Sequence, residues 1–244
     1  SAEDKKPTFS DAAKELIAKI KPMMAKDRDG AMAAYLKGAR ELAKQFPSEV
    51  GPRAMMLEAA SMSSDEKLKK KTITELAGLK DEKFARITDR AKSELKKMNA
   101  LGNPVPIKFT SVNGRKVDVS KMKGKVVLID FWATWCGPCV AEIPNVKKTY
   151  AKLHKKGFEI IGISLDSKED KLTEFVAEKG MPWPQHFDGK GWSNAIAKEF
   201  GIRSIPAMWL IDTKGNLVDM NARHNLEEKV EKLLAAGKDS PSEK

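Results

Sequence analysis

The sequence predicts an all-α helical region followed by a layered α/β region, and three observations support this division. Apolar residues recur at steps of three and four from about Phe9 to Leu101, as amphipathic helices require. The segment Gly102–Pro106 then interrupts that pattern. Beyond it, short apolar runs typical of buried strands alternate with helical segments, which indicates a sheet with helices on both faces.

The helical region is expected to form a small array of helices. Their predicted bounds are Phe9–Met24, Asp29–Phe46, Ser48–Met62, Ser64–Leu79 and Asp81–Met98. Asp29 or Gly30 opens the second helix and Pro47 stops it, while Ser64 and Asp81 are suitable N-caps. No residue pattern in this region identifies a function.

The α/β region begins with a hairpin, because Asn113-Gly114 is a strong turn signal between two short strands. The predicted strands are Ile107–Thr110, Lys116–Val119, Lys125–Phe131, Phe158–Leu165, Ala207–Ile211 and Leu217–Asn221. The predicted helices are Cys136–Leu153, Asp170–Lys179, Trp192–Phe200 and Leu226–Ala236. We therefore expect a helical N-terminal domain of unknown role (1–101), a linker (102–106), an α/β domain (107–238) and a flexible tail (239–244).

The net charge of +11 raises the question of nucleic-acid binding. The excess is spread evenly, with +6 over residues 1–104 and +5 over residues 105–244, and it is interleaved with acids. We therefore expect no nucleic-acid partner. The longest apolar runs fall far short of the roughly 20 residues that cross a bilayer, so no transmembrane segment is expected.

The chain has only two cysteines, Cys136 and Cys139, in the stretch FWATWCGPC. Two cysteines cannot form the disulfide framework of a small secreted domain. A zinc site would need two further ligands, and the three histidines are scattered along the sequence. We therefore expect no metal and no separate cofactor, and we interpret the pair as a redox-active dithiol or disulfide.

The position of the pair favours redox chemistry. A strand ending at Phe131-Trp132 delivers Cys136 to the start of the next helix, where free N–H groups and the helix dipole stabilise a thiolate. Cys136 should be the exposed nucleophile, and Cys139, one turn further, can attack a mixed disulfide formed there. Gly137-Pro138 keeps the turn tight at little cost, because proline suits the first helical turn.

The motif FWATWCGPC resembles the active site of the thioredoxin superfamily. Residues from about Pro104 to Gly237 are similar to its exported TlpA- and ResA-like thiol-disulfide oxidoreductases. The hairpin before the first buried strand, AEIP after the second cysteine and RSIPAMWLID all match that branch. The resemblance implies a thioredoxin-like fold with a central mixed sheet, and it does not cover the helices up to Leu101.

The resemblance also implies roles for individual residues. Ile205-Pro206 matches the cis-proline pair whose backbone binds an extended substrate. Glu142 matches an acidic residue that handles protons near the cysteines, with a surface helix charge as the alternative. Together with Trp135, which we expect to wall the substrate approach, Gly137 and Pro138 are assigned to substrate binding.

Asp130 interrupts an apolar strand, and a carboxylate buried there should have a raised pKa suited to proton transfer. It corresponds to the buried Asp of ordinary thioredoxins. The Lys that partners this Asp in thioredoxin is replaced by Gly162 in IIGISLD. Two roles for Asp130 therefore stay open: it relays protons with Cys139, or it is a buried acid with a structural role.

We expect an enzyme that reduces or exchanges disulfides of protein substrates, because Gly-Pro between the cysteines is the dipeptide of reducing thioredoxins. A peroxiredoxin-like peroxidase is the first alternative. It is disfavoured because Ala133 and Ile129 stand where that family has Thr and Pro before its reactive cysteine. The second alternative is a non-catalytic interaction module in which the helical region binds a partner and the redox domain is accessory.

The chain starts Ser-Ala-Glu without a methionine or an apolar leader. Either a cytosolic protein was trimmed or a signal peptide is absent. The resemblance favours a periplasmic or otherwise exported protein, which receives electrons from a membrane thiol reductase and serves cytochrome c maturation or related redox homeostasis.

Overall fold

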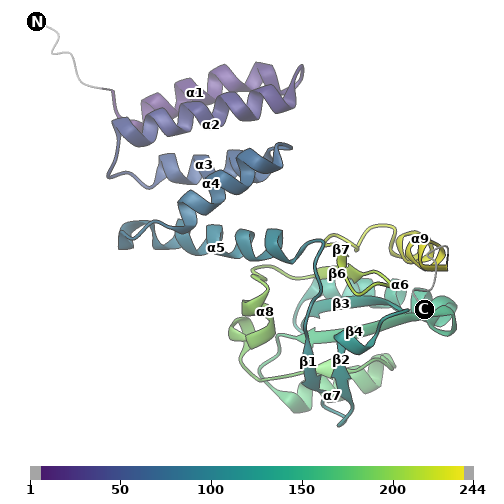
Figure 1. The fold of residues 1–244 in the computed structure, drawn as a ribbon. Helices are drawn as coiled ribbons and strands as arrows, with labels where there is room; N and C mark the ends of the chain where they lie inside the picture. Colours follow the sequence, from purple (N-terminus) through teal and green to yellow (C-terminus); the bar gives the residue numbers. More distant parts are fainter. Residues whose placement is uncertain (1–6, 239–244) are drawn as a thin grey trace, which may run out of the picture. The chain divides into compact units, whose positions relative to one another are not determined.

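The computed structural model describes residues 7–238, which form two compact units that divide between Met98 and Asn99 (Figure 1). Each unit has its own apolar core. The predicted flexible tail at 239–244 lies outside the described residues.

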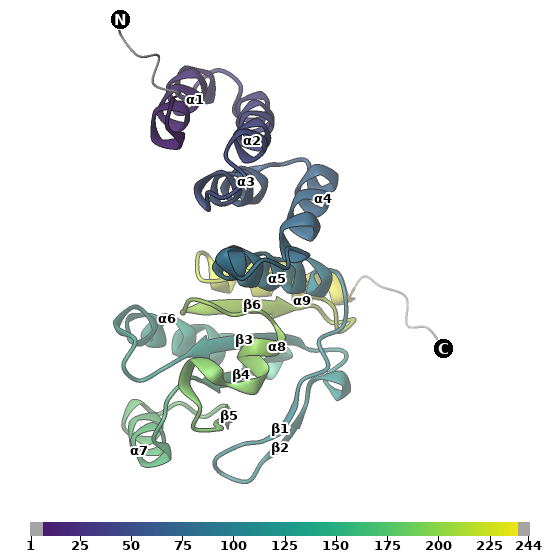
Figure 2. The same ribbon diagram turned by 90° about the vertical axis from the view of Figure 1, so that its left-hand side faces the viewer.

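The first unit is helical, as predicted. Its helices are α1 (Phe9–Met24), α2 (Arg28–Gln45), α3 (Gly51–Met62), α4 (Glu66–Ala77) and α5 (Ala85–Ala100), with a 3-10 turn at Glu82–Phe84. α1 packs against α2, α2 against α3 and α3 against α4 (Figure 2). Their apolar faces bury side chains such as Leu36, Leu57 and Ile73. The apolar spacing in the sequence therefore identifies the core face of these helices.

Two helices in this unit start elsewhere than predicted, because in each an aspartate other than the predicted residue is the N-cap. The Asp27 carboxylate accepts the backbone N–H of Gly30 at 2.9 Å, so α2 begins before Asp29. In α4 the Asp65 carboxylate, and not Ser64, accepts the N–H of Leu68 at 2.9 Å. Adjacent residues of the N-capping type cannot be ranked from sequence alone.

The other two starts also differ in detail. The third helix begins at Gly51 and not at Ser48, with Pro52 in its first turn, where a missing N–H costs little. Asp81 is confirmed as a cap, since its carboxylate accepts the N–H of Lys83 at 3.1 Å, but it caps the 3-10 turn that leads into α5.

The second unit contains a five-stranded mixed sheet and a separate hairpin. The strands are β1 (Lys108–Thr110), β2 (Lys116–Asp118), β3 (Val126–Trp132), β4 (Phe158–Ser164), β5 (Gln185–His186), β6 (Ala207–Ile211) and β7 (Leu217–Asp219). The sheet order is β5-β4-β3-β6-β7. β3, β4 and β5 pair in parallel, and β6 pairs antiparallel with both β3 and β7. The predicted mixed sheet and the β1–β2 hairpin are confirmed, whereas β5 was not expected.

Helices cover both faces of this sheet, as predicted. They are α6 (Gly137–Leu153), α7 (Glu169–Lys179), α8 (Ala195–Glu199) and α9 (Leu226–Lys238). Because parallel crossovers are right-handed, α6 and α7 lie on one face, and α9 contacts α6 there. The opposite face carries α8 (Figures 1 and 2). The predicted helix Trp192–Phe200 is in fact a 3-10 turn at Gly191–Ser193 followed by the short α8.

The segment 102–106, expected as a linker, is held within the second unit. The backbone N–H of Gly102 donates to the carbonyl of Leu217 at 2.7 Å, and Pro104 forms a bridge with Asn216. Val105 is buried in the core. Across residues 7–238, each helix is either too short or too polar to cross a lipid bilayer.

Candidate active site

The two cysteines lie at the junction of β3 and α6. β3 ends at Trp132, and a short turn leads to Cys136, the N-cap of α6. Cys136 and Cys139 form a disulfide with an S–S distance of 2.16 Å and a Cα–Cα distance of 5.2 Å. The Cys136 Sγ also accepts the backbone N–H of Cys139 at 3.3 Å. A negative charge on Cys136 would therefore lie at the positive end of the helix.

The expectation that Cys136 is exposed is wrong for this disulfide-bonded state. Its side chain is 6% exposed and that of Cys139 is 3% exposed. Both cysteines belong to the core of the unit, and the bond joins their sulfur atoms there. The neighbouring Trp135, Gly137 and Pro138 are exposed, so a substrate would approach the disulfide over these residues.

The Ile205–Pro206 peptide bond is cis, as the resemblance implies. Both residues are half-buried and directly precede β6. The first residue of β6, Ala207, pairs with Phe131 near the end of β3. Because β3 and β6 are antiparallel, Pro206 lies at the same end of the sheet as the cysteines.

Asp130 lies within β3 and is 9% exposed. Burial, and secondly the charge of Glu142, raise the pKa of Asp130 to about 7. The strand register places Gly162 opposite Asp130, as the family comparison of the sequence indicated. A side chain at Gly162 would collide with the amide of Gln185, so the lysine of thioredoxin has no room here.

Glu142 lies on α6, one turn after Cys139, and forms an ion pair with Arg223. The Arg223 Nε donates to the Glu142 carboxylate at 2.8 Å, and both side chains are partly exposed. Arg223 follows β7 and is 81 residues away in sequence, so no local pattern signals this contact. The ion pair fixes the position of the carboxylate whose charge acts on Asp130.

Sequence reasoning also missed the side chain that holds the turn before Cys136. The buried Asp166 follows β4, and its carboxylate accepts the backbone N–H of Thr134 at 3.1 Å and the Thr134 hydroxyl at 2.6 Å. The Ser164 hydroxyl donates to the same carboxylate at 2.7 Å. These bonds tie the turn to the end of β4. The only sequence signal is a carboxylate directly after a buried strand.

The five tryptophans of the chain occupy two kinds of environment. Trp132, Trp183 and Trp209 are buried, as expected for core residues. Trp135 and Trp192 are 54% and 48% exposed, and their ring centroids are 6.1 Å apart. The two exposed rings form an aromatic surface directly beside Cys136.

Comparison with known proteins agrees with this geometry. The Redoxin family matches residues 100–236, which leaves α1 to α4 and all of α5 except its last residue outside the match. The thiol-disulfide oxidoreductase ResA of Bacillus anthracis is 34% identical over 125 residues, which cover 51% of this chain and 70% of the relative. ResA of Bacillus subtilis is 27% identical over 106 residues, covering 43% and 58%.

Solved structures of thiol-disulfide oxidoreductases are also similar to the second unit of this chain. The thioredoxin domain of a thiol-disulfide oxidoreductase from Bacteroides vulgatus is 32% identical, with a TM-score of 0.51 and coverage of 55% of this chain and 98% of that domain. The C-terminal domain of a thiol-disulfide oxidoreductase from Bacteroides thetaiotaomicron is 27% identical, with a TM-score of 0.53 and coverage of 58% and 99%. The chain therefore belongs to the Redoxin family, as a TlpA- and ResA-like member of the thioredoxin superfamily, and its Cys136–Cys139 disulfide supports a thiol-disulfide oxidoreductase.

Proposed function

We propose that this protein reduces or exchanges disulfides of protein substrates through Cys136 and Cys139. The observation that carries the proposal is the disulfide between the N-cap of α6 and a residue one turn further. The exposed rings of Trp135 and Trp192, with Pro206 at the same end of the sheet, support a substrate larger than a small disulfide. An extended, partly apolar segment that carries a cystine fits such a surface.

The reductive half-reaction consumes the dithiol form. The Cys136 thiolate attacks one sulfur of the substrate disulfide, the other substrate sulfur leaves as a thiolate, and a mixed disulfide remains. The Cys139 thiolate then attacks the Cys136 sulfur and releases the second substrate sulfur. Two electrons pass to the substrate, the Cys136–Cys139 disulfide forms, and no cofactor beyond these two sulfurs is required.

Proton transfer in this cycle is assigned to Asp130 and Glu142. Cys139 must lose a proton before it attacks, and a carboxyl group with a pKa of about 7 can accept one at neutral pH. The Glu142 carboxylate, held by Arg223, raises the pKa of Asp130 and so strengthens it as a base. Asp130 acts on Cys139, and Glu142 is a positioning and electrostatic partner.

The second half of the cycle needs an external dithiol that reduces the Cys136–Cys139 disulfide. A membrane thiol reductase is the proposed donor, and a periplasmic or otherwise exported location with a role in cytochrome c maturation is proposed with it. The names of the relatives support the thiol-disulfide oxidoreductase activity on which this assignment rests. The helical unit lies outside the matched family, so it has no assigned part in this cycle. Docking of a partner is the role proposed for it.

Insulin reduction by dithiothreitol tests the proposal. The parent protein should accelerate the reaction, Cys136→Ser should abolish the acceleration, and Cys139→Ser should accumulate a mixed disulfide with substrate. Peroxide consumption without a disulfide substrate provides the contrast. Peroxide turnover at the rate of insulin reduction, or full activity in Cys136→Ser, would contradict the proposed function.

The helical unit can be tested separately with a chain that begins at Gly102. An interaction module predicts that this variant loses activity on protein substrates but keeps its activity on small disulfides. Equal loss on both substrates would instead indicate that the helices stabilise the redox unit.

A further inference from the structure

The loop between β5 and α8 carries an exposed tryptophan to the redox site. This loop, residues 187–194, is called the Trp192 loop below. It holds the Trp192 ring 6.1 Å from that of Trp135, measured between the ring centroids. Because an exposed side chain changes its rotamer within nanoseconds, the place of such a ring depends on how firmly its backbone is held.

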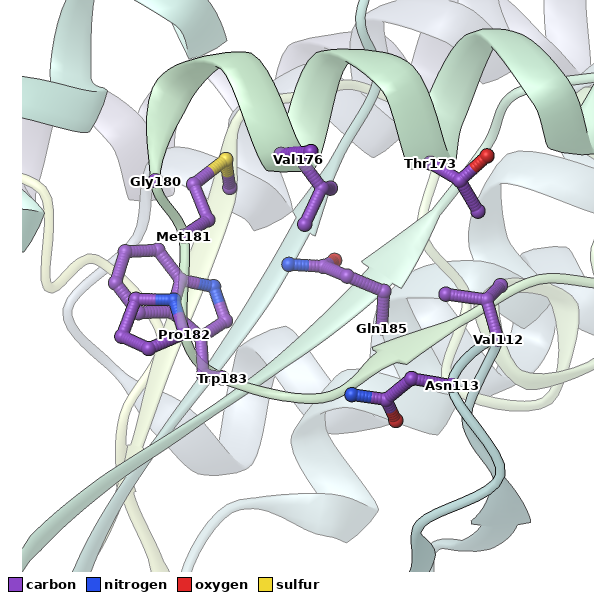
Figure 3. Close-up of a pocket in the computed structure, with 10 residues that line it drawn as sticks. Val112, Asn113, Thr173, Val176, Gly180, Met181, Pro182, Trp183 and Gln185 are labelled. Atoms are coloured by element: carbon purple, nitrogen blue, oxygen red, sulfur yellow. The ribbon is translucent and has the colours of Figure 1, made fainter.

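The start of the Trp192 loop is fixed by β5. The backbone carbonyl of Gln185 accepts the N–H of Val112 at 3.0 Å, and its side-chain Oε1 accepts the indole N–H of Trp132 at 2.9 Å. The Gln185 side chain lies between α7 and the β1–β2 hairpin loop in Figure 3. The Trp192 loop therefore leaves the sheet from a strand that is bound on both sides.

The end of the Trp192 loop is held by Asn194, which is fully buried. The Asn194 Oδ1 accepts the N–H of Ala197 at 3.0 Å and so caps α8. The Asn194 Nδ2 donates to the backbone carbonyl of Ser164 at 3.3 Å and lies 3.2 Å from the His186 Nδ1. Because Oδ1 is used as the acceptor, Nδ2 is the donor in both contacts, and the His186 Nδ1 accepts.

Ser164, the last residue of β4, anchors both sides of the aromatic surface. Its carbonyl accepts from Asn194 on the side of the Trp192 loop. Its hydroxyl donates to the Asp166 carboxylate, which holds Thr134, the residue before Trp135. The two exposed rings are therefore tied to one residue at the end of a buried strand.

We propose that Asn194 is a positioning residue for protein substrates. By holding the Trp192 loop to β4, it keeps Trp192 beside Trp135 and maintains the surface on which a substrate lies next to its disulfide. This inference rests on the proposed function, disulfide exchange with protein substrates. Because Asn194 is fully buried, it cannot touch a substrate, so its effect passes through Trp192 and concerns substrate binding.

The Asn194→Ser variant removes the amide donor but keeps a side-chain oxygen of the type that caps helices. It should raise KM for insulin roughly 2- to 10-fold, the range expected for the loss of an aromatic contact. The value of kcat and the rate with hydroxyethyl disulfide should not change. Asn103→Ser is the matched control, since the Asn103 amide donates to the carbonyl of Asn99 at the opposite end of the sheet. It should leave KM unchanged.

A double-mutant cycle with Trp192→Ala separates positioning from general damage to the fold. If Asn194 acts through Trp192, Asn194→Ser should raise KM no further in a protein that already lacks the ring. The ¹⁵N-labelled, disulfide-bonded protein gives a second measurement that needs no activity. The indole N–H resonances of Trp135 and Trp192 should both shift in Asn194→Ser, whereas that of Trp183, on the α7 side of the sheet, should not.

Asp188→Ala tests the same loop if Asn194→Ser does not fold. The half-buried Asp188 carboxylate accepts the N–H groups of Lys190 at 3.0 Å and of Ala195 at 2.9 Å. Its loss should also raise KM for insulin and shift the Trp192 resonance. An unchanged KM and an unchanged resonance in this variant would count against positioning by the loop.

Three results would overturn the proposal. The first is an unchanged KM for insulin in a folded Asn194→Ser protein. The second is the same increase in KM with and without Trp192, and the third is an equal loss of activity on hydroxyethyl disulfide. Inactivity of the parent protein on insulin would instead contradict the proposed function, and the Trp192 resonance would still show whether Asn194 positions the ring.

Discussion

Replacing Asp130 by asparagine should remove a pH-dependent stability penalty from the redox unit. The structure raises the pKa of this carboxyl from 3.8 to about 7, chiefly through burial. At roughly 1.4 kcal/mol for each pH unit between these values, the ionised side chain costs the folded state about 4 kcal/mol. Asparagine carries no charge at any of these pH values, so Asp130→Asn abolishes the effect.

The direction in which pH changes the stability follows from proton binding by Asp130. Between pH 3.8 and about 7, folded Asp130 keeps a proton that the unfolded chain has lost, so stability falls as the pH rises. Below this range both states are protonated, and above it the penalty is complete. Relative to the wild type, Asp130→Asn should therefore gain about 3 kcal/mol of unfolding free energy between pH 5 and pH 8.5.

Urea unfolding followed by tryptophan fluorescence is the appropriate assay. All five tryptophans of the chain lie between residues 132 and 209, so the signal reports the redox unit and not the helical unit. Both proteins are compared with the disulfide intact. Parallel pH profiles for wild type and Asp130→Asn would refute the reasoning, because they would mean that Asp130 does not ionise in this range.

The Glu142→Gln variant tests which of the two causes, burial or the charge of Glu142, raises the pKa of Asp130. Because burial outweighs the charge of Glu142, this variant should keep most of the pH slope of the wild type. A profile as flat as that of Asp130→Asn would show instead that repulsion between the two carboxylates dominates. The two variants therefore separate desolvation from charge.

Three further substitutions test other contacts. Thr134→Val removes the hydroxyl that donates to the buried Asp166, and it should cost about 1–3 kcal/mol in the same urea assay, whereas an unchanged midpoint would show that the turn is held otherwise. Gly162→Ala places a methyl group against the Gln185 amide and should cost about 1–3 kcal/mol, and a neutral result would mean that the amide moves freely. Trp192→Ala should raise KM for insulin several-fold and leave the turnover of a small disulfide unchanged, since the ring is exposed beside the site. Equal effects on both substrates would exclude a docking role.

Much of the fold could be predicted because its signals are local. The apolar runs that form β3 and β4, with the helical pattern between them, identify a parallel pair whose crossover carries the cysteines. The Asn113-Gly114 turn likewise identifies the β1–β2 hairpin. The strand β5 was not predicted, because its two residues are too few to show a periodic pattern. Its place in the sheet depends on pairing with β4.

The site was predictable only to the extent that its residues belong to one motif or to a family pattern. Cys136, Cys139 and Pro206 could be assigned in this way. Arg223 and Asp166 could not, because their partners lie 81 and 32 residues away and meet them only through the folded sheet. The burial of Cys136 was also misjudged, since the position of a residue at the start of a helix does not show how the folded core packs around it.

In the proposed cycle, the charges near the disulfide would allow a single buried acid to carry the proton transfer. Glu142 is held by Arg223 at the protein surface, so its charge is partly solvated while it still raises the pKa of Asp130. If both carboxylates were buried, the second one would also lose its hydration, and the two charges would repel each other more strongly. With Glu142 ion-paired at the rim and the pKa of Asp130 near 7, the proposed site would take up or release a single proton near neutral pH. The thiolate that the proposed cycle forms at Cys136 would lie at the start of α6, where the helix N–H groups favour a negative charge.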